Sequence, residues 1–201
     1  MPTNLPAFII GYHGCDQDLA EIVLSGKDSL KISQNKYDWL GKGIYFWENN
    51  PRRAYQWAQE HAGSTSSNIK IPYAIGAIID PGLCLDLTEA KSLSLVKETH
   101  ALIKEIFDKK GMHLKKNEDV PGSSDLLKRF LDCQVINGLH ILREEIGKQQ
   151  PFDSVRSPFF EGDRLYETSG FYEKAHIQIC VRKHSSILGY FRIIEEGVFD
   201  K

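Results

Sequence analysis

The sequence predicts a single α+β domain, and two observations lead to that prediction. The chain has 201 residues, a length that suits one domain or one domain with an insertion. Short apolar runs, typical of buried strands, alternate with longer stretches in which apolar residues recur at helical spacing. We therefore expect one domain over residues 1–201.

The first quarter of the chain is predicted to begin with a strand and a helix. Residues 8–12 are apolar and partly β-branched, which favours a buried strand. Residues 16–24 are predicted to be helical, with Asp16 as the N-cap. Residues 44–47 form the next short strand, and Pro51 then opens a second helix because proline suits the first helical position.

The middle of the chain is predicted to contain a long strand followed by two helices. Residues 71–79 are expected to form a buried strand. Amphipathic helices follow at about 89–109, where Thr88 is the expected cap, and at 125–147. We interpret residues 89–150 as a helical insertion that packs against one face of the domain.

The last quarter of the chain is predicted to close the fold. Residues 151–175 are expected to be irregular, and a loop of that length inside a compact domain is usually functional. Residues 176–181 and 187–191 have the composition and alternation of strands. Because a short basic turn separates them, they are expected to pair as a β-hairpin.

Charge and cysteine content restrict the class of protein. The formal net charge of −2 gives no global attraction to nucleic acid or to an anionic membrane, although a local basic groove remains compatible with it. The four cysteines are far apart and form no CxxC pair, so we expect reduced thiols and no metal site. No signal peptide or membrane-spanning run is recognisable, and we expect a cytoplasmic location.

Two motifs far apart in the chain have the residues of a binding site for a flat ligand. Residues 38–50 read DWLGKGIYFWENN, where two glycines bracket Lys42 and Tyr45 stands on the strand that follows. The Gly-x-Gly pattern lets the backbone come close to a ligand, and a tyrosine can lay its ring against an aromatic heterocycle. Upstream, the apolar run at 8–14 ends in Tyr-His-Gly.

A strand that ends in His-Gly, then a helix, then Gly-Lys-Gly-Ile-Tyr-Phe resembles the diphtheria-toxin-like and poly(ADP-ribose) polymerase-like ADP-ribosyltransferases. In that family a histidine on the first strand and a tyrosine on a later one clamp the nicotinamide end of NAD. A third signature residue, usually glutamate, lies on a strand near the C-terminus. The resemblance covers most of the chain outside residues 89–150. It implies a split pair of antiparallel sheets with flanking helices and a helical insertion, and NAD as a substrate.

The resemblance carries NAD-binding roles onto the matching positions. His13 is expected to donate a hydrogen bond to a ribose hydroxyl, Gly14 to offer its backbone N–H and C=O to the nicotinamide amide, and Tyr45 to stack on the ring. Two loop residues, Ser33 and Asn35, either hold the glycine loop in place or touch the NAD ribose. The complete expected NAD-binding set is His13, Gly14, Ser33, Asn35, Gly43, Tyr45, Tyr55 and His176.

The third catalytic position departs from the family pattern, because residues 176–181 include no glutamate. Alternation puts Gln178 in phase with His176, and we assign Gln178 to this position. His176 is the second candidate and Glu173 the third, while a solvated Gln178 is the alternative interpretation. A neutral amide supplies only a dipole, which favours transfer of a single ADP-ribose over chain elongation.

The loop before residues 176–181 is expected to recognise the acceptor. Glu161 is the candidate for deprotonating or orienting the acceptor group. Aromatic residues interleaved with basic ones are compatible with single-stranded nucleic acid, and a protein side chain fits equally well. Near Pro51, Arg52 and Arg53 are expected to be solvated or to face a phosphate. The basic residues that would contact nucleic acid in this interpretation are Arg156, Arg164, Arg182 and Lys183.

The predicted function is mono-ADP-ribosyl transfer from NAD to a protein or a nucleic acid, in a toxin held by an antitoxin or in a phage-defence effector. An NAD glycohydrolase and an inactive module that binds ADP-ribose or a partner protein are the alternatives. A dehydrogenase is disfavoured, because Gly41-Lys42-Gly43 enters a strand rather than the helix of a G-x-G-x-x-G turn.

Overall fold

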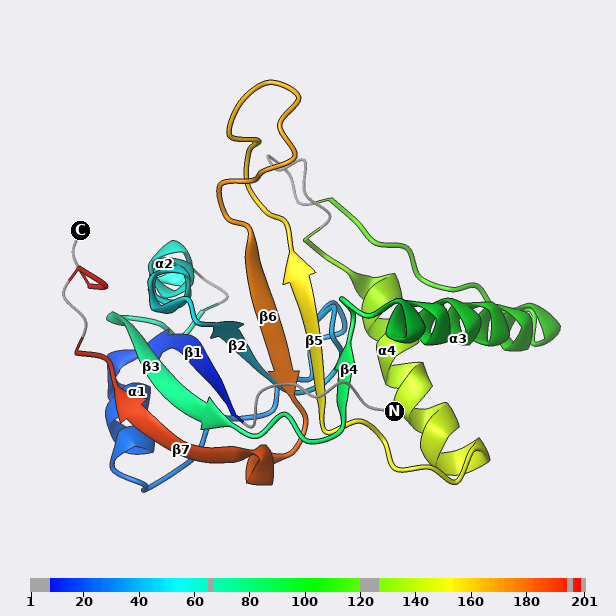
Figure 1. Cartoon of the computed structure of the whole chain (residues 1–201), viewed down its shortest axis with the longest axis horizontal. Helices are drawn as coiled ribbons and strands as arrows, with labels where there is room; N and C mark the ends of the chain where they lie inside the picture. Colours follow the sequence, from blue (N-terminus) through cyan, green and yellow to red (C-terminus); the bar gives the residue numbers. More distant parts are fainter. Residues whose placement is uncertain (1–7, 65–66, 120–126, 195–196, 200–201) are drawn as a thin grey trace.

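A computed structural model describes residues 8–64, 67–119, 127–194 and 197–199 of the chain (Figure 1). These residues form an α+β structure, as predicted, with one seven-stranded sheet. The elements in chain order are β1 (Ile9–Asp16), α1 (Gln17–Leu24), β2 (Ile44–Glu48), α2 (Pro51–His61), β3 (Pro72–Ile79), β4 (Cys84–Asp86), α3 (Ala90–Lys109), α4 (Phe130–Ile141), a π-helical turn (Leu142–Ile146), β5 (Ser154–Phe159), β6 (His176–Val181), a 3-10 turn (His184–Ser186) and β7 (Ile187–Arg192).

The strands form one mixed sheet rather than the expected split pair. Their order is β4-β5-β6-β2-β1-β3-β7, and every neighbouring pair is antiparallel except the parallel pair of β4 and β5. Strand β6 pairs with β2 on one side and with β5 on the other, so it joins the two halves into one sheet. The expectation of two separate antiparallel sheets was therefore wrong.

The last two strands do not form a hairpin, which corrects a second expectation. Strand β6 lies inside the sheet, whereas β7 pairs with β3 at the far edge. The 3-10 turn at His184–Ser186 leads the chain to that edge. There the ring of Phe191 covers Gly76, where a Cβ would overlap the ring. Glycine at position 76 therefore leaves the space that the Phe191 ring occupies when β7 pairs with β3.

Part of the segment expected to be irregular is strand β5. Val155 on this strand is fully buried. Arg156 follows it and points to the opposite face of the sheet, where the pattern of a buried strand would favour an apolar side chain. The guanidinium of Arg156 is paired with Glu48 at 2.6 Å and with Asp86 at 3.0 Å. The sequence pattern does not reveal this strand, because the charge of Arg156 interrupts the apolar alternation. Its two carboxylate partners are far away in the chain and come close only in the folded sheet.

The first two helices begin as predicted. Asp16 caps α1, since its carboxylate accepts a 3.0 Å hydrogen bond from the backbone N–H of Asp18. Pro51 is the first residue of α2, and the side chain of Asn50 caps this helix by accepting from Arg53 N–H. These local signals were sufficient because each depends only on residues within one turn.

The later helices differ from the prediction at their starts. Thr88 does not cap α3, because its hydroxyl donates to Asp86 at 2.8 Å instead. Helix α4 begins at Phe130 rather than near 125, and residues 120–126 lie outside the described chain. Just before α4, Lys128 exchanges backbone hydrogen bonds with Glu118, which keeps Lys128 out of the helix.

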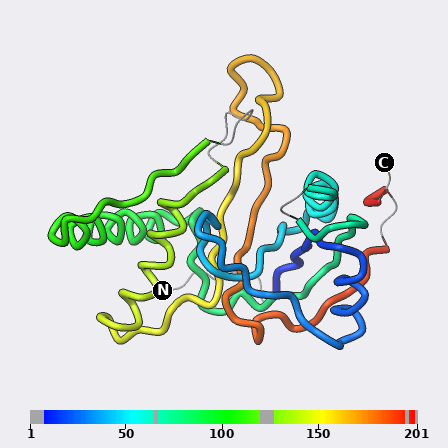
Figure 2. The backbone as a smooth tube through the Cα atoms, turned by 180° about the vertical axis from the view of Figure 1, so that it is seen from behind, coloured from blue at the N-terminus to red at the C-terminus, as the bar shows by residue number. Residues whose placement is uncertain are grey.

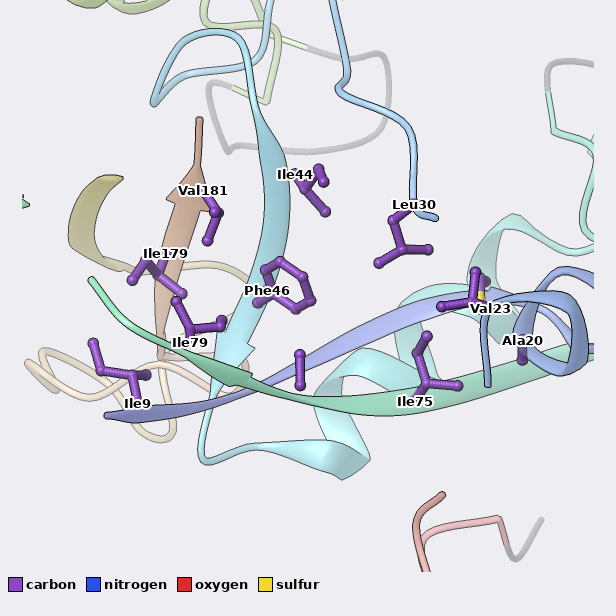
Figure 3. Packing of buried hydrophobic residues seen from close by; sticks show 12 residues of the cluster. Ile9, Ala20, Val23, Leu30, Ile44, Phe46, Ile75, Ile79, Ile179 and Val181 are labelled. Atoms are coloured by element: carbon purple, nitrogen blue, oxygen red, sulfur yellow. The ribbon is translucent and has the colours of Figure 1, made fainter. Parts of the chain in front are cut away.

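The two faces of the sheet are covered differently. Helix α1 covers one face over the main apolar core, in which Phe46 and Ile179 are fully buried (Figure 3). The other face is covered by α2 over β1 and β3 and by α4 over β4, β5 and β6. Figures 1 and 2 show α2 and the α3–α4 pair toward opposite edges of the sheet. The helical insertion thus packs on one face, and among the described residues no helix covers the strip of that face between α2 and α4.

None of the helices among the described residues combines the length and the apolar character that a bilayer crossing requires.

Candidate functional site

The three strands that carry the predicted catalytic residues are neighbours in the sheet. The order β6-β2-β1 places the segment of Gln178 beside that of Tyr45, and Tyr45 beside the segment of His13 and Gly14. The backbone segments that the sequence analysis singled out are therefore brought together from three distant parts of the chain. What each side chain does there depends on the geometry described below.

Strands β1 and β2 separate where the predicted site begins. Their register contains Gly11 opposite Glu48 and Tyr12 opposite Trp47, and His13 follows that last pair. The imidazole of His13 then bridges the diverging strands, with Nδ1 at 2.8 Å from the carbonyl oxygen of Tyr45. A side chain thus takes the place of a backbone ladder bond at this point.

The contact fixes the tautomer of His13. A carbonyl oxygen can only accept, so Nδ1 of His13 carries the proton and donates to Tyr45. Burial lowers the pKa of His13, which keeps the ring neutral near pH 7. Nε2 is then a hydrogen-bond acceptor. A ribose hydroxyl would donate to His13, the reverse of the direction expected from the sequence.

Gly14 presents its backbone toward the gap between the two strands. The carbonyl of Ile10, four residues earlier, accepts from Asn49 on the β2 side. Because alternate residues of an antiparallel strand direct both polar groups to the same side, the N–H and C=O of Gly14 also point toward β2. A Cβ at position 14 would overlap the backbone carbonyl of Ala54 on α2. Only glycine therefore fits between this helix and the strand.

Tyr45 is anchored to the glycine loop. Its hydroxyl donates to the carbonyl of Gly41 at 2.8 Å and accepts from the N–H of Leu40 at 3.0 Å. Gly41 has a φ of 83°, a conformation that favours glycine. At Gly43 a Cβ would overlap the sulfur of Cys180. Burial raises the pKa of Tyr45 well above its ordinary value, so the hydroxyl stays protonated and keeps both bonds.

The side chains of His13 and Tyr45 lie on opposite faces of the sheet. The His13 ring is 5.7 Å from the ring of Phe46, which belongs to the core under α1. Tyr45 precedes Phe46 on the strand and packs against the cluster under α4. A ligand that contacts both side chains would therefore have to reach both faces of the sheet at the point where β1 and β2 stop pairing.

The two β6 candidates for the third position share the face of Tyr45. Gln178 is opposite Trp47 in the register, and its side-chain oxygen accepts a 2.7 Å hydrogen bond from the indole of Trp39. Gln178 is therefore half-buried and hydrogen-bonded within the fold rather than fully solvated. His176 is 8% exposed, between the rings of Trp47 and Phe159. Glu173, the remaining candidate, is exposed in the loop before β6.

Arg53 is buried, so of the two expectations for this residue the solvated one was wrong. Its side chain is 4% exposed and lies over the ring of Trp47, 6.0 Å from the ring centre. Its guanidinium contacts the carboxylate of Glu161 at 2.8 Å and that of Glu60 at 3.4 Å. Glu161, the predicted acceptor-activating residue, thus fastens its loop to α2.

Sequence reasoning missed a cluster of buried polar atoms beside this ion pair. Trp47 Nε1, Arg53 Nε and His176 Nε2 are each buried without a protein hydrogen-bond partner. Nδ1 of His176 donates to the carbonyl of Lys174, and burial lowers the pKa of this histidine, so its Nε2 is an acceptor. Two donors and one acceptor match a group that both accepts and donates, such as a hydroxyl or a carboxamide. The sequence signal that could have pointed to this cluster is the alternation along residues 176–181, which places His176 on the same face of the strand as Gln178.

Two further predicted contacts belong to the scaffold. The hydroxyl of Ser33 donates to Asp38 at 2.5 Å, Asn35 donates to Ser33 at 3.1 Å, and Ser33 exchanges backbone bonds with Gly43. Of the two alternatives, Ser33 and Asn35 thus hold the glycine loop. The ring of Tyr55 packs 5.1 Å from that of Phe199, in the cluster around α2 rather than beside His13.

The basic residues expected to bind nucleic acid have partners within the fold. Besides Arg156, whose two carboxylate partners are given above, Arg182 donates to the carbonyl of Phe152 at 2.8 Å. Lys183 pairs with Asp153, and Arg164 donates to the carbonyl of Ser169. These four side chains therefore make contacts within the fold at the positions where the sequence predicted a binding surface.

Two cavities lie on either side of the start of α4. One of about 360 Å³ lies between α3, α4 and Trp39. The other, of about 230 Å³, borders the glycine loop and contains Asn35 and Lys42. Among the residues that the structure describes, no group of three or more His, Cys, Asp and Glu side chains is placed to hold a metal ion.

Comparison with known proteins shows a similarity that extends over most of the chain. The chain is 27% identical over 191 residues to Uncharacterized protein MJ0359 of Methanocaldococcus jannaschii, a match that covers 88% of this chain and 83% of that protein. No protein-family model matches the chain. No solved structure matches it either.

Proposed function

We propose that the protein binds NAD at the gap between β1 and β2 and transfers its ADP-ribose to a macromolecular acceptor. The observation that carries this proposal is the adjacency of β1, β2 and β6 in the sheet. Together with the His-Gly and Gly-Lys-Gly-Ile-Tyr-Phe motifs, it supports an ADP-ribosyltransferase-like arrangement of the site. The residues involved would be His13, Gly14, Tyr45 and the polar side chains of β6.

The backbone of Gly14 suits the carboxamide of nicotinamide. One N–H and one C=O directed to the same side complement the carbonyl and the NH₂ of an amide. His13 Nε2 would accept a hydrogen bond from a ribose hydroxyl, as its Nδ1 proton is used by Tyr45. The amide would fix the ring and the hydroxyl would fix the sugar, which orients the bond to be broken.

In the proposed reaction, the bond between the nicotinamide nitrogen and ribose C1′ breaks, and its electron pair stays with nicotinamide, which leaves as a neutral ring. A lone pair of an acceptor oxygen or nitrogen forms the new bond to C1′, and the acceptor proton passes to solvent. The sugar passes through a species with oxocarbenium character, as in glycoside hydrolysis. A carboxylate would stabilise this cation best, but β6 supplies only His176 and Gln178 as polar side chains. We therefore propose single transfers at a modest rate rather than chain elongation.

A second candidate function is binding of NAD or ADP-ribose without turnover. The specific observation in its favour is that the side-chain oxygen of Gln178 already accepts from Trp39 at 2.7 Å. An amide oxygen used in this way is less able to accept a bond from a ribose hydroxyl. In this second case His13 and Gly14 would hold the ligand, and no group would stabilise a cation.

The experiment is incubation of the purified protein with NAD labelled in the adenylate half, with and without cell lysate, while released nicotinamide is measured in parallel. A transferase labels macromolecules, a glycohydrolase releases nicotinamide without labelling them, and a binding module does neither. Digestion of the product with protease or nuclease then identifies the acceptor class.

The matched variants are Tyr45→Phe, which keeps the ring, and Tyr45→Ala, which removes it. If the ring stacks on nicotinamide, turnover persists in the first and is lost in the second. Gly189→Ala is the control, because a Cβ at Gly189 has no atom within 4 Å. Absence of both NAD binding and nicotinamide release from wild-type protein would contradict the proposal.

A further inference from the structure

We propose that the lysine-lined cavity beside the glycine loop binds single-stranded nucleic acid. We further propose that this strand is the acceptor of ADP-ribose, and this part of the proposal rests on the proposed function. The cavity has a volume of about 230 Å³. This is smaller than the roughly 300–1,000 Å³ of drug-sized sites and suits one nucleotide of a longer strand.

The charge of the cavity is strongly positive for this protein. Lys36, Lys42 and Lys115 line it, and none of its lining residues in the described chain is acidic. The whole chain has a formal net charge of −2, so three lysines in one small cavity are a local concentration of positive charge. Such a concentration attracts a polyanion whose phosphates can each take a lysine.

Aromatic rings beside the lysines favour nucleic acid over other polyanions. Phe130 lines the cavity, and Lys115 Nζ lies 5.0 Å from the centre of its ring. Tyr37 is 43% exposed and meets Phe130 edge-on, with ring centres 6.0 Å apart. Stacking of bases on exposed aromatic rings next to a basic groove is the general mode of single-strand binding.

Carboxamide side chains supply the remaining polar groups of the cavity. Asn35, Gln134 and Asn137 all line it. A carboxamide has two donor hydrogens and two acceptor lone pairs, so the hydrogen bonds that these residues make within the protein leave capacity for the edge of a base. An acidic peptide would use the lysines but would have no need of these amides and rings. The combined chemistry therefore favours a nucleotide strand.

The cavity is connected to the proposed NAD site through the glycine loop. Lys42 lies between Gly41 and Gly43, and its backbone N–H donates to Asn137 at 3.1 Å. The carbonyl of Gly41 holds the hydroxyl of Tyr45. A strand bound over Lys42 therefore lies next to the residues that begin β2, close to where ADP-ribose would be released for transfer.

The test is fluorescence anisotropy with fluorescein-labelled single-stranded RNA and DNA of roughly a dozen nucleotides, measured without NAD. The variant Lys36→Glu/Lys42→Glu/Lys115→Glu is compared with Lys27→Glu/Lys91→Glu/Lys110→Glu. The control changes the same charge at exposed positions outside the cavity. We expect the cavity variant to lose roughly tenfold or more in affinity and its salt slope to fall by about two, since three phosphate contacts are removed from a single strand. The control variant is expected to bind within about twofold of wild type.

Equal losses in the two triple variants, or unchanged binding in the cavity variant, would overturn the proposal. So would displacement of the strand by polyglutamate of matched charge, since this would show a site for any polyanion. If the cavity triple variant does not fold, the single variants Lys36→Gln and Lys115→Gln decide, and each is expected to reduce affinity and the salt slope. The assay contains no NAD, so failure of strand binding leaves the NAD proposal intact.

A second assay, with NAD added to the folded cavity variant, tests whether NAD turnover persists when the proposed strand-binding cavity is changed. The variant is expected still to release nicotinamide from NAD while leaving the oligonucleotide unmodified. Modification of the oligonucleotide at the wild-type level in this variant would show that the cavity does not hold the acceptor.

Discussion

Nδ1 of His13 and the carbonyl oxygen of Tyr45 lie 2.8 Å apart, and this hydrogen bond spans the gap where β1 and β2 stop pairing. It connects the two motifs of the sequence directly, since one residue comes from each. It also determines the chemistry of the other imidazole nitrogen, because a proton on Nδ1 of a neutral ring leaves Nε2 as an acceptor.

This relationship can be tested by comparing His13→Asn with His13→Ala. The amide of asparagine can place a donor near the position of Nδ1, but it has no atom at the position of Nε2. We expect His13→Asn to keep most of the stability of the wild type, and His13→Ala to lose about 0.5–1.5 kcal/mol with the hydrogen bond. Thermal unfolding measures both. Equal destabilisation by the two substitutions would show that the Tyr45 contact is not what His13 contributes to folding.

Gly14 is predicted to tolerate no side chain. Because a Cβ there would overlap the carbonyl of Ala54, Gly14→Ala must displace α2 from the strand. We expect a loss of roughly 1–3 kcal/mol in the free energy of unfolding. Gly189→Ala, also on a strand but with open space around the new methyl group, is expected to stay within about 0.5 kcal/mol of wild type. Chemical denaturation of the two variants compares them, and similar midpoints would count against the close contact of α2 with β1.

The ion pair of Arg53 and Glu161 is predicted to be structural. Glu161→Gln leaves a 4% exposed guanidinium with Glu60 as its remaining carboxylate partner. Removing one partner of a buried pair costs up to about 3–5 kcal/mol, and we expect about 1–3 kcal/mol here because Glu60 remains. That loss corresponds to roughly 2–4 °C in Tm for each kcal/mol.

The double variant Arg53→Met/Glu161→Leu distinguishes a structural role of the Arg53–Glu161 ion pair from a role of Glu161 in activating the acceptor. It is expected to recover part of the lost stability, because no uncompensated charge is left. If instead Glu161→Gln leaves Tm unchanged and abolishes transfer, Glu161 acts on the acceptor, as the sequence analysis predicted.

Stability is predicted to fall in mild acid, and His140 on α4 is one cause. Burial, with the neighbouring Arg182 and Arg143, lowers the pKa of His140 to about 3. The unfolded histidine has a pKa of about 6.5, so below that pH the unfolded chain binds a proton that the folded protein excludes. The contribution of neutral His140 to the free energy of unfolding is fully present above about pH 6.5. It is lost by up to about 1.4 kcal/mol per pH unit as the pH falls from there toward the pKa of the folded protein.

The variant His140→Leu removes this titration. We expect its Tm to fall less steeply than that of wild type between about pH 6.5 and 4. Some slope will remain, because burial also lowers the pKa of His13 and of His176. Parallel curves for the two proteins would show that His140 is not kept neutral by the fold.

Signals carried by adjacent residues were predictable from the sequence. Asp16 caps its helix and Pro51 opens the next one, and both effects act within a single helical turn. The strands around the two glycine motifs were also predicted, since apolar residues fill them. The α+β class follows from these elements alone.

Features that depend on distant partners were not predictable. Strand β5 was missed because Arg156 occupies an inward position that is satisfied only by Glu48 and Asp86. The buried position of Arg53 likewise requires Glu161, which is distant in the chain. The tautomer of His13 depends on a backbone carbonyl of another strand. In each case the side chain has the chemistry of a surface residue, and only the fold supplies its partner.

The most direct test of the central claim is isothermal titration calorimetry of NAD into the wild-type protein and into His13→Asn. The account predicts that wild type binds NAD, and that His13→Asn binds it roughly tenfold or more weakly with little change in Tm, because the lost Nε2 acceptor is worth on the order of 1.4 kcal/mol. Equal affinities, or no heat of binding in wild type, would show that NAD does not occupy the gap between β1 and β2.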